Sequence, residues 1–171
     1  VDLLARHPQA AMDFIELRST LEGMSAYYAA ERGTAEDRAM LARRFAAMEE
    51  AHNTPELAGK EEDERDADFH IAIAEASHNV ILLHVMRSLL GMIRKDVVFN
   101  RAQLYSESGA RDSLLEQHRA VFQAIMARDP DGARDAAQTH MGHVARVLRA
   151  AQEDEGRAEV ARLRLSRYEA E

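Results

Sequence analysis

Apolar residues recur every three or four positions along most of this chain, which is the periodicity of amphipathic helices. Thr34 followed by Asp37 resembles a capping box, and Asp129 before Pro130 is typical of a helix start. Two interruptions, HNTPELAGK and RAQLYSESGARD, separate longer helical patterns. The pattern therefore predicts six helices, at about residues 10–32, 34–51, 61–77, 80 to beyond 99, 112–128 and 130 to about 149 or beyond.

Three details of this pattern predict how the helices are placed. The fourth helix begins VILLHVMRSLLGMI, which is so apolar that we expect it at the centre of the fold. The residues after 150 lose the apolar stripe, which indicates a solvated or frayed tail. The predicted buried stripe of the first helix consists of Phe14, Leu17, Leu21, Met24 and Tyr28.

Composition agrees with one all-α domain, a single antiparallel bundle of about six or seven helices spanning residues 1–171. The 171 residues are 46% hydrophobic but only 5% aromatic, which favours packing by Ala, Leu, Ile and Met. The chain has no cysteine, and its apolar runs are too short for a bilayer, so we expect a cytoplasmic protein without a membrane partner. The net charge of -8 argues against a DNA-binding face on this chain. Because Val1 is not preceded by Met, we expect a piece of a longer protein.

Histidines fall inside the apolar stripes, where their side chains should point inward. His118 lies between Leu114 and Phe122 in the fifth helix, and His140 lies in the middle of the sixth. In the third helix Asp66 and His70 are four residues apart and share one face. Burying several imidazoles without partners costs on the order of a few kcal/mol each. A divalent metal ion shared by these four residues in the core of the bundle would satisfy them all.

The residues alone leave open an alternative in which the buried histidines have a structural role and bind no metal. A histidine on an apolar face can be bonded to a backbone carbonyl or a carboxylate, and Asp66 could be the partner of His70. The other five histidines are weaker candidates for a ligand set: His7, His52, His78, His84 and His143. His143 is the strongest competitor among them, since it follows His140 by three residues.

Two segments resemble known signatures. DADFHIAIAEASHN and EQHRAVFQAIMARDPDGARDAAQTHM are similar to the two motifs of the FCD domain, the ligand-binding domain of GntR-type transcriptional regulators of the FadR subgroup. His70 and His118 are 48 residues apart, and His118 and His140 are 22 apart, as in that family. FIELRSTLEGMSAYYAAERGT is similar to its first helix, so the resemblance covers about residues 12–150. EASHNVILLHVMRSL resembles the lactate-responsive and pyruvate-dehydrogenase-operon repressors of the subgroup.

The resemblance implies a site and partners. Asp66, His70, His118 and His140 match the family's metal ligands, with zinc the first choice and nickel, cobalt or manganese the alternatives. Arg18 and Asn79 match residues near the effector pocket. Gln117 departs from the family, where Glu commonly precedes the histidine. An N-terminal winged-helix domain, absent from this chain, would contact DNA as part of a homodimer, with Val1 near the linker.

The function that follows is the sensing of a small carboxylic acid. Four protein ligands on a six-coordinate ion leave two positions, which a 2-hydroxy or 2-keto acid such as lactate or pyruvate would chelate, with Arg18 holding a carboxylate oxygen. The rival classes are a metalloenzyme acting on a small carboxylate and a helical domain with a purely structural metal. Glu75 and Asp68 lie off the ligand face, so no general base is evident, and we expect no enzyme.

Overall fold

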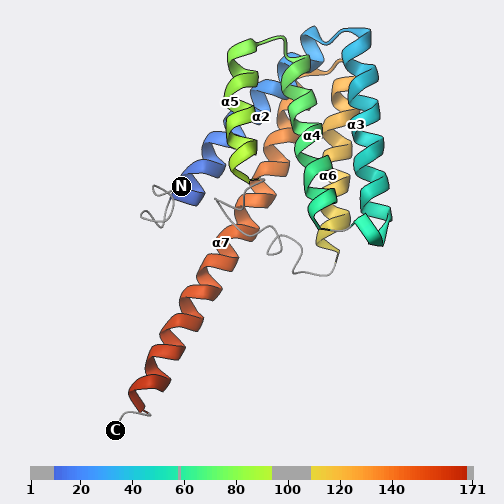
Figure 1. Cartoon of the computed structure of the whole chain (residues 1–171). Helices are drawn as coiled ribbons and strands as arrows, with labels where there is room; N and C mark the ends of the chain where they lie inside the picture. The colour runs from blue at the N-terminus through green and yellow to red at the C-terminus, as the bar shows by residue number, and fades with distance from the viewer. Residues whose placement is uncertain (1–9, 58, 94–108, 169–171) are drawn as a thin grey trace.

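Six α-helices form the part of the chain that the computed structural model describes, residues 10–57, 59–93 and 109–168 (Figure 1). A short 3₁₀ helix, η1 (Pro55–Leu57), lies inside the predicted HNTPELAGK interruption. The all-α prediction is confirmed. The α-helices are α2 (Ala10–Arg32), α3 (Ala35–Asn53), α4 (Lys60–Ala76), α5 (Val80–Ile93), α6 (Ala110–Met126) and α7 (Pro130–Tyr168).

The predicted helix starts at α3 and α7 are confirmed. The Asp37 amide donates to Thr34 Oγ1 at 3.1 Å, and the Thr34 amide donates to Asp37 Oδ2 at 2.8 Å, which completes the capping box. Asp129 Oδ1 accepts from the Gly132 amide at 3.0 Å, and Pro130 occupies the first helical position of α7. These local contacts fix where each helix begins.

Successive helices run in opposite directions and enclose one core (Figure 1). α2 packs along α7 and also contacts α4, α5 and α6, while α3 covers α4 and α6. Phe45, Phe69 and Ile125 belong to one buried cluster, and Ile15, Met86 and Met141 belong to another. None of the described helices combines the length and the apolar character that crossing a membrane requires.

The predicted stripe of α2 was wrong for two of its members. Leu17 and Met24 are exposed to 50% and 39%, whereas the charged Arg18 and Glu22 are buried. The reason is close contact with α7: a Cβ atom on Gly23 would lie 3.2 Å from Gln138 Cγ. Small residues permit this approach, and in this part of α2 the buried positions are therefore Gly23, Ala26 and Ala30 and not Leu17 and Met24.

The prediction that α5 is central was also wrong. Val80 and Ile81 are 76% and 73% exposed, and only Leu82, Met86 and Leu90 are buried. α5 covers α2 and α4 from one side, so a single face of it meets the core. The predicted continuation of this helix beyond Ile93, the interruption at 101–108 and the linker expected near Val1 lie outside the described residues.

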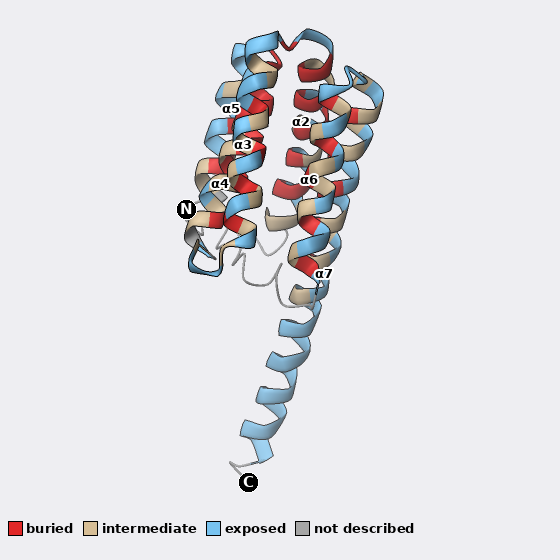
Figure 2. Ribbon diagram, turned by 90° about the vertical axis from the view of Figure 1, so that its right-hand side faces the viewer, coloured by how far each residue is buried: buried red, intermediate tan, exposed pale blue. Residues whose placement is uncertain are grey.

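The last segment is solvated, as predicted, but it is not frayed. α7 continues as a helix to Tyr168, and all the residues from 152 to 168 are exposed (Figure 2). Figure 1 shows this part of α7 projecting away from the other helices. α7 therefore has a buried half that carries His140 and an exposed half.

Candidate metal centre

Three helices bring four polar side chains into the interior of the bundle. Asp66 and His70 lie one turn apart on α4, His118 lies on α6 and His140 on α7, and all four are buried. The fully buried Phe69 belongs to the cluster of Phe45 and Ile125, and its ring meets the rings of His70 and His118 edge-on. The predicted inward orientation of His118 and His140 is confirmed.

The donor atoms have the spacing of ligands around one ion. His118 Nε2 lies 3.2 Å from His70 Nε2 and 3.2 Å from Asp66 Oδ1, and His70 Nε2 lies 3.9 Å from Asp66 Oδ1. One ligand nitrogen from each of the three histidines lies within 4.8 Å of the others. With metal–ligand bonds of about 2.1 Å and angles of about 90° to 110°, neighbouring donors are about 3.0 to 3.4 Å apart. The residues therefore fit a divalent metal ion.

Glu22 on α2 holds the ring of His70. Its Oε2 lies 2.9 Å from His70 Nδ1, and its Oε1 accepts from Arg18 Nε at 2.9 Å. An ionised carboxylate only accepts, so Nδ1 of His70 carries the proton, and the lone pair of a neutral ring is on Nε2, toward the other histidines. Burial raises the pKa of Glu22, but the charges and hydrogen bonds of His70 and Arg18 outweigh burial and hold the pKa below its usual value.

Gln117 supports His140 in the same manner. His140 Nδ1 lies 3.1 Å from Gln117 Oε1, which accepts the ring proton and leaves Nε2 for an ion. Burial, followed by the neighbouring His118 and His70, lowers the pKa of His140 well below its usual value. The ring is therefore neutral near pH 7, the form that can coordinate a metal. The family that the motifs resemble commonly has Glu where this chain has Gln117. In this chain a neutral amide oxygen therefore accepts the bond in place of a carboxylate.

The two expected effector residues lie in different surroundings. Arg18 is buried and joined to the histidines through Glu22. Asn79 instead caps α5, where its Oδ1 accepts from the Leu82 amide at 3.0 Å, in the turn after the end of α4. The structure assigns Asn79 a contact that shapes the α4–α5 turn and does not join it to the histidine cluster.

The remaining histidines that the structure describes have other partners or face solvent. His52 Nε2 lies 2.8 Å from Asp112 Oδ1, and His78 Nε2 lies 2.7 Å from Asp37 Oδ2. His84 is exposed, and His143 Nδ1 contacts Arg146 at 3.4 Å. His7 lies outside the described residues.

Sequence reasoning missed Glu22, although a signal was present. Arg18 and Glu22 are a charged pair at i and i+4, between buried apolar positions of α2. Such a pair on an inward face requires a polar partner in the core. The partner, His70, is 48 residues away in the sequence, so only the folded chain identifies it.

Comparison with known proteins agrees with this fold. Residues 13–143 match the FCD domain model, which is most of the chain. The chain therefore belongs to the FCD domain family, and the resemblance noted from its motifs is confirmed. Its matched relatives are transcriptional regulators, and none of those named below is an enzyme.

Two of the relatives that the chain matches are regulators of transcription by name. It is 36% identical over 162 residues to the putative L-lactate dehydrogenase operon regulatory protein of Escherichia coli K12, covering 94% of this chain and 60% of the relative. It is 31% identical over 149 residues to the Glc operon transcriptional activator of Escherichia coli K12, covering 86% of this chain and 59% of the relative. The chain thus spans about three fifths of the length of these relatives.

Solved structures support the fold alone. A GntR protein of Streptococcus agalactiae aligns with a TM-score of 0.66 at 24% identity, over 81% of this chain and 59% of that one. A GntR-family transcriptional regulator of Pseudomonas syringae aligns with a TM-score of 0.71 at 16% identity, over 88% of this chain and 60% of that one.

Proposed function

We propose that this chain is the effector-sensing domain of a bacterial transcriptional regulator and binds a small 2-hydroxy or 2-keto acid at a metal ion. Asp66, His70, His118 and His140 hold the ion, with zinc the first choice among divalent metals. The observation that carries the proposal is the convergence of three buried imidazoles and one carboxylate from three helices. The donor atoms of Asp66, His70 and His118 are 3.2 to 3.9 Å apart, and a ring nitrogen of His140 lies within 4.8 Å of those of the other two histidines.

The balance of buried charge favours a monoanion. A divalent ion contributes +2 and Arg18 +1, while Asp66 and Glu22 contribute -1 each, so the loaded site has a net charge of +1. A buried net charge is unfavourable without a counterion. A monocarboxylate such as lactate or pyruvate would neutralise the site, whereas a dicarboxylate would leave an excess negative charge.

Arg18 is the side chain suited to receive the carboxylate. Its hydrogen bond to Glu22 uses Nε. The terminal guanidinium nitrogens commonly donate hydrogen bonds to the carboxylate of a ligand. A bound metal ion would act as a Lewis acid and would hold the oxygen atoms of the small carboxylic acid. The residues of the chain orient the ion, exclude water and neutralise charge.

The names of the relatives support the choice of acid. Two of them are named for the L-lactate dehydrogenase operon and the Glc operon. We infer that binding of the acid changes the DNA affinity of a winged-helix domain in the full-length homodimer, by moving α2 and α5 against the linker. The net charge of -8 is consistent with DNA contact through another domain.

A metalloenzyme has less support. Asp68 pairs with Arg44 at 3.1 Å and Glu75 pairs with Arg87 at 2.6 Å, so these two carboxylates point toward partners on α3 and α5. Neither lies in the ligand set. A purely structural metal is the remaining alternative, and it predicts that no small acid acts through the ion.

A thermal-shift panel tests the proposal. Lactate or pyruvate at about 100 times its dissociation constant should stabilise zinc-loaded protein by about 2.7 kcal/mol, and the metal-free protein should respond little. His118→Ala should lose both metal, by elemental analysis, and the response to acid. Stoichiometric metal in His118→Ala would place the ion elsewhere. Stabilisation by a fatty acyl-CoA or a sugar acid but not by lactate or pyruvate would overturn the effector.

A further inference from the structure

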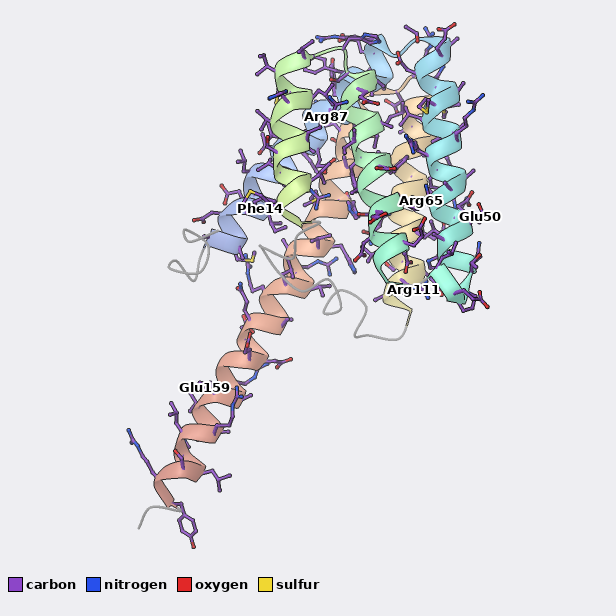
Figure 3. The ribbon with its side chains drawn as sticks, viewed as in Figure 1. Phe14, Glu50, Arg65, Arg87, Arg111 and Glu159 are labelled. Carbon is purple, nitrogen blue, oxygen red and sulfur yellow. The ribbon has the colours of Figure 1, made fainter. Side chains whose placement is uncertain are left out.

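The exposed half of α7 has no contact with another of the described helices, and its printed ion pairs, Arg157 with Glu153 and Asp154 and Arg162 with Glu159, lie within the helix itself. We call residues 152–168 the α7 extension. All of its residues are exposed, and Figure 3 shows Glu159 on it, beyond the bundle. Seventeen helical residues span about 25 Å. A helix of this length has little stability alone in water, so a surface that covers it would stabilise it.

Charge is divided between the two halves of the α7 extension. Residues 152–159 contain four acidic residues and one arginine, a net charge of -3, and residues 160–168 contain three arginines and no acid, a net charge of +3. The helix dipole favours cations at the last turn, but it does not explain acids in the middle of α7. The four acids are Glu153, Asp154, Glu155 and Glu159, and the three arginines are Arg162, Arg164 and Arg167.

Two apolar residues and a glycine are enough to form a short helix-pairing seam, although the longer apolar stripe ends near residue 150. Gly156, Val160 and Leu163 are separated by four and three residues, and Glu153 and Arg167 extend the same 3–4 spacing at either end. Val160 and Leu163 are 48% and 54% exposed, so their apolar surface is available. The seam thus has apolar residues at its centre and opposite charges at its ends.

We propose that the α7 extension pairs antiparallel with the α7 extension of a second copy of this chain. In that arrangement the -3 half of one helix lies along the +3 half of the other, Glu153 lies near Arg167 of the second copy, and the two Val160 side chains meet near a two-fold axis. Parallel pairing would place like charges side by side over the whole length. The contact is isologous and therefore closes as a dimer.

The absence of cysteine from the chain allows a direct test of the direction. Gln152→Cys and Tyr168→Cys change no charge and lie at opposite ends of the α7 extension. We expect disulfide dimers when the two variants are mixed and oxidised, and few when either is oxidised alone. Efficient cross-linking of Gln152→Cys with itself would overturn the antiparallel arrangement, and no cross-linking in any mixture would overturn the pairing.

Charge reversal tests the cause of the pairing. By sedimentation of the full chain at high micromolar concentration in low salt, we expect a dimer. The variant Arg162→Glu, Arg164→Glu, Arg167→Glu should be monomeric, and so should Glu153→Arg, Asp154→Arg, Glu155→Arg, but an equal mixture should dimerise. Arg43→Glu, on the exposed face of α3, serves as the control and should remain a dimer. A monomeric wild-type chain, or a dimer in either triple variant alone, would refute the proposal.

Discussion

Among single residues, Glu22 has the largest expected effect on the metal centre without being a ligand. Its carboxylate fixes the ring of His70 at 2.9 Å and also neutralises Arg18. Glu22→Ala should lower metal affinity by about 10- to 100-fold, because an unsupported ligand ring loses its orientation and its favoured tautomer. Competition with a chromophoric chelator measures the affinity, and ¹⁵N NMR of the metal-free protein reports which nitrogen of His70 carries the proton.

Glu62 offers a matched control for Glu22. It is also a buried carboxylate held by an arginine, since Arg111 donates to both of its oxygens at 3.0 and 3.1 Å. Figure 3 shows Arg111 near the start of α6. Glu62→Ala should lower stability and leave metal affinity unchanged. Equal losses of affinity in the two variants would mean that Glu22 acts only through general stability.

The pKa of Asp37 predicts how the stability of the folded chain depends on pH. Burial raises the pKa of Asp37, but hydrogen bonds from the Thr34 amide and hydroxyl, together with His78, outweigh burial and lower the pKa. The unfolded chain therefore binds the proton more readily, and the contribution of Asp37 is present near neutral pH and lost as pH falls through its folded pKa. Asp37→Asn should cost about 1 kcal/mol at pH 7 and much less at low pH.

Urea unfolding at several pH values measures this difference. Glu36→Gln, at the exposed neighbouring position, is the control and should change stability little at any pH. A destabilisation of Asp37→Asn that is the same at pH 7 and at low pH would show that the carboxylate's charge is not the cause.

Among the elements, helix positions were predictable from sequence, and so was the inward orientation of His118 and His140, but the buried face of α2 and the place of α5 were not. Apolar period, the capping box at Thr34 and the Asp129–Pro130 start are local features, so they predict helix bounds. The buried face of a helix depends on which neighbour approaches it. The spacing of apolar residues in α2 does not predict its close contact with α7 at Gly23. The apolar α5 likewise lies at an edge because only one of its faces meets the bundle.

The α7 extension should be dispensable for the fold of the bundle. Among the residues that the structure describes, a chain ending at Ala151 loses only exposed ones, so the metal content and the thermal midpoint at low micromolar concentration should remain close to those of the whole chain. Differential scanning calorimetry and elemental analysis check this. A large loss of stability in the shortened chain at a concentration where the whole chain is monomeric would show that the extension supports the bundle itself.

For the whole molecule, metal removal should loosen three helices together. The ligands come from α4, α6 and α7, so an ion ties these helices to one another, and metal at about 100 times its dissociation constant adds about 2.7 kcal/mol. Hydrogen exchange with and without zinc should show lost protection around His70, His118 and His140, and smaller changes in α3. A uniform change over all helices, or none, would contradict a site that joins these three.

The family, and the three histidines that meet in the core, were accessible from sequence for a physical reason. A metal site needs particular side chains at particular places, so His70, His118 and His140 leave a fixed spacing in the chain. The charged pair of Arg18 and Glu22 on a buried face signals a polar partner but not which one, because hydrogen-bond support can come from any helix that packs against the ring.

One continuous helical rod joins His140, which we propose as a ligand, to the exposed end of α7 at Tyr168. Tyr168 lies 28 residues beyond His140 on the same helix, a distance of about 42 Å. A rotation of this rod by only about 5° at His140 would swing its tip by about 4 Å, more than the width of an atom. α7 thus has the shape of a lever arm whose short end is held in the metal centre and whose long end amplifies any movement there.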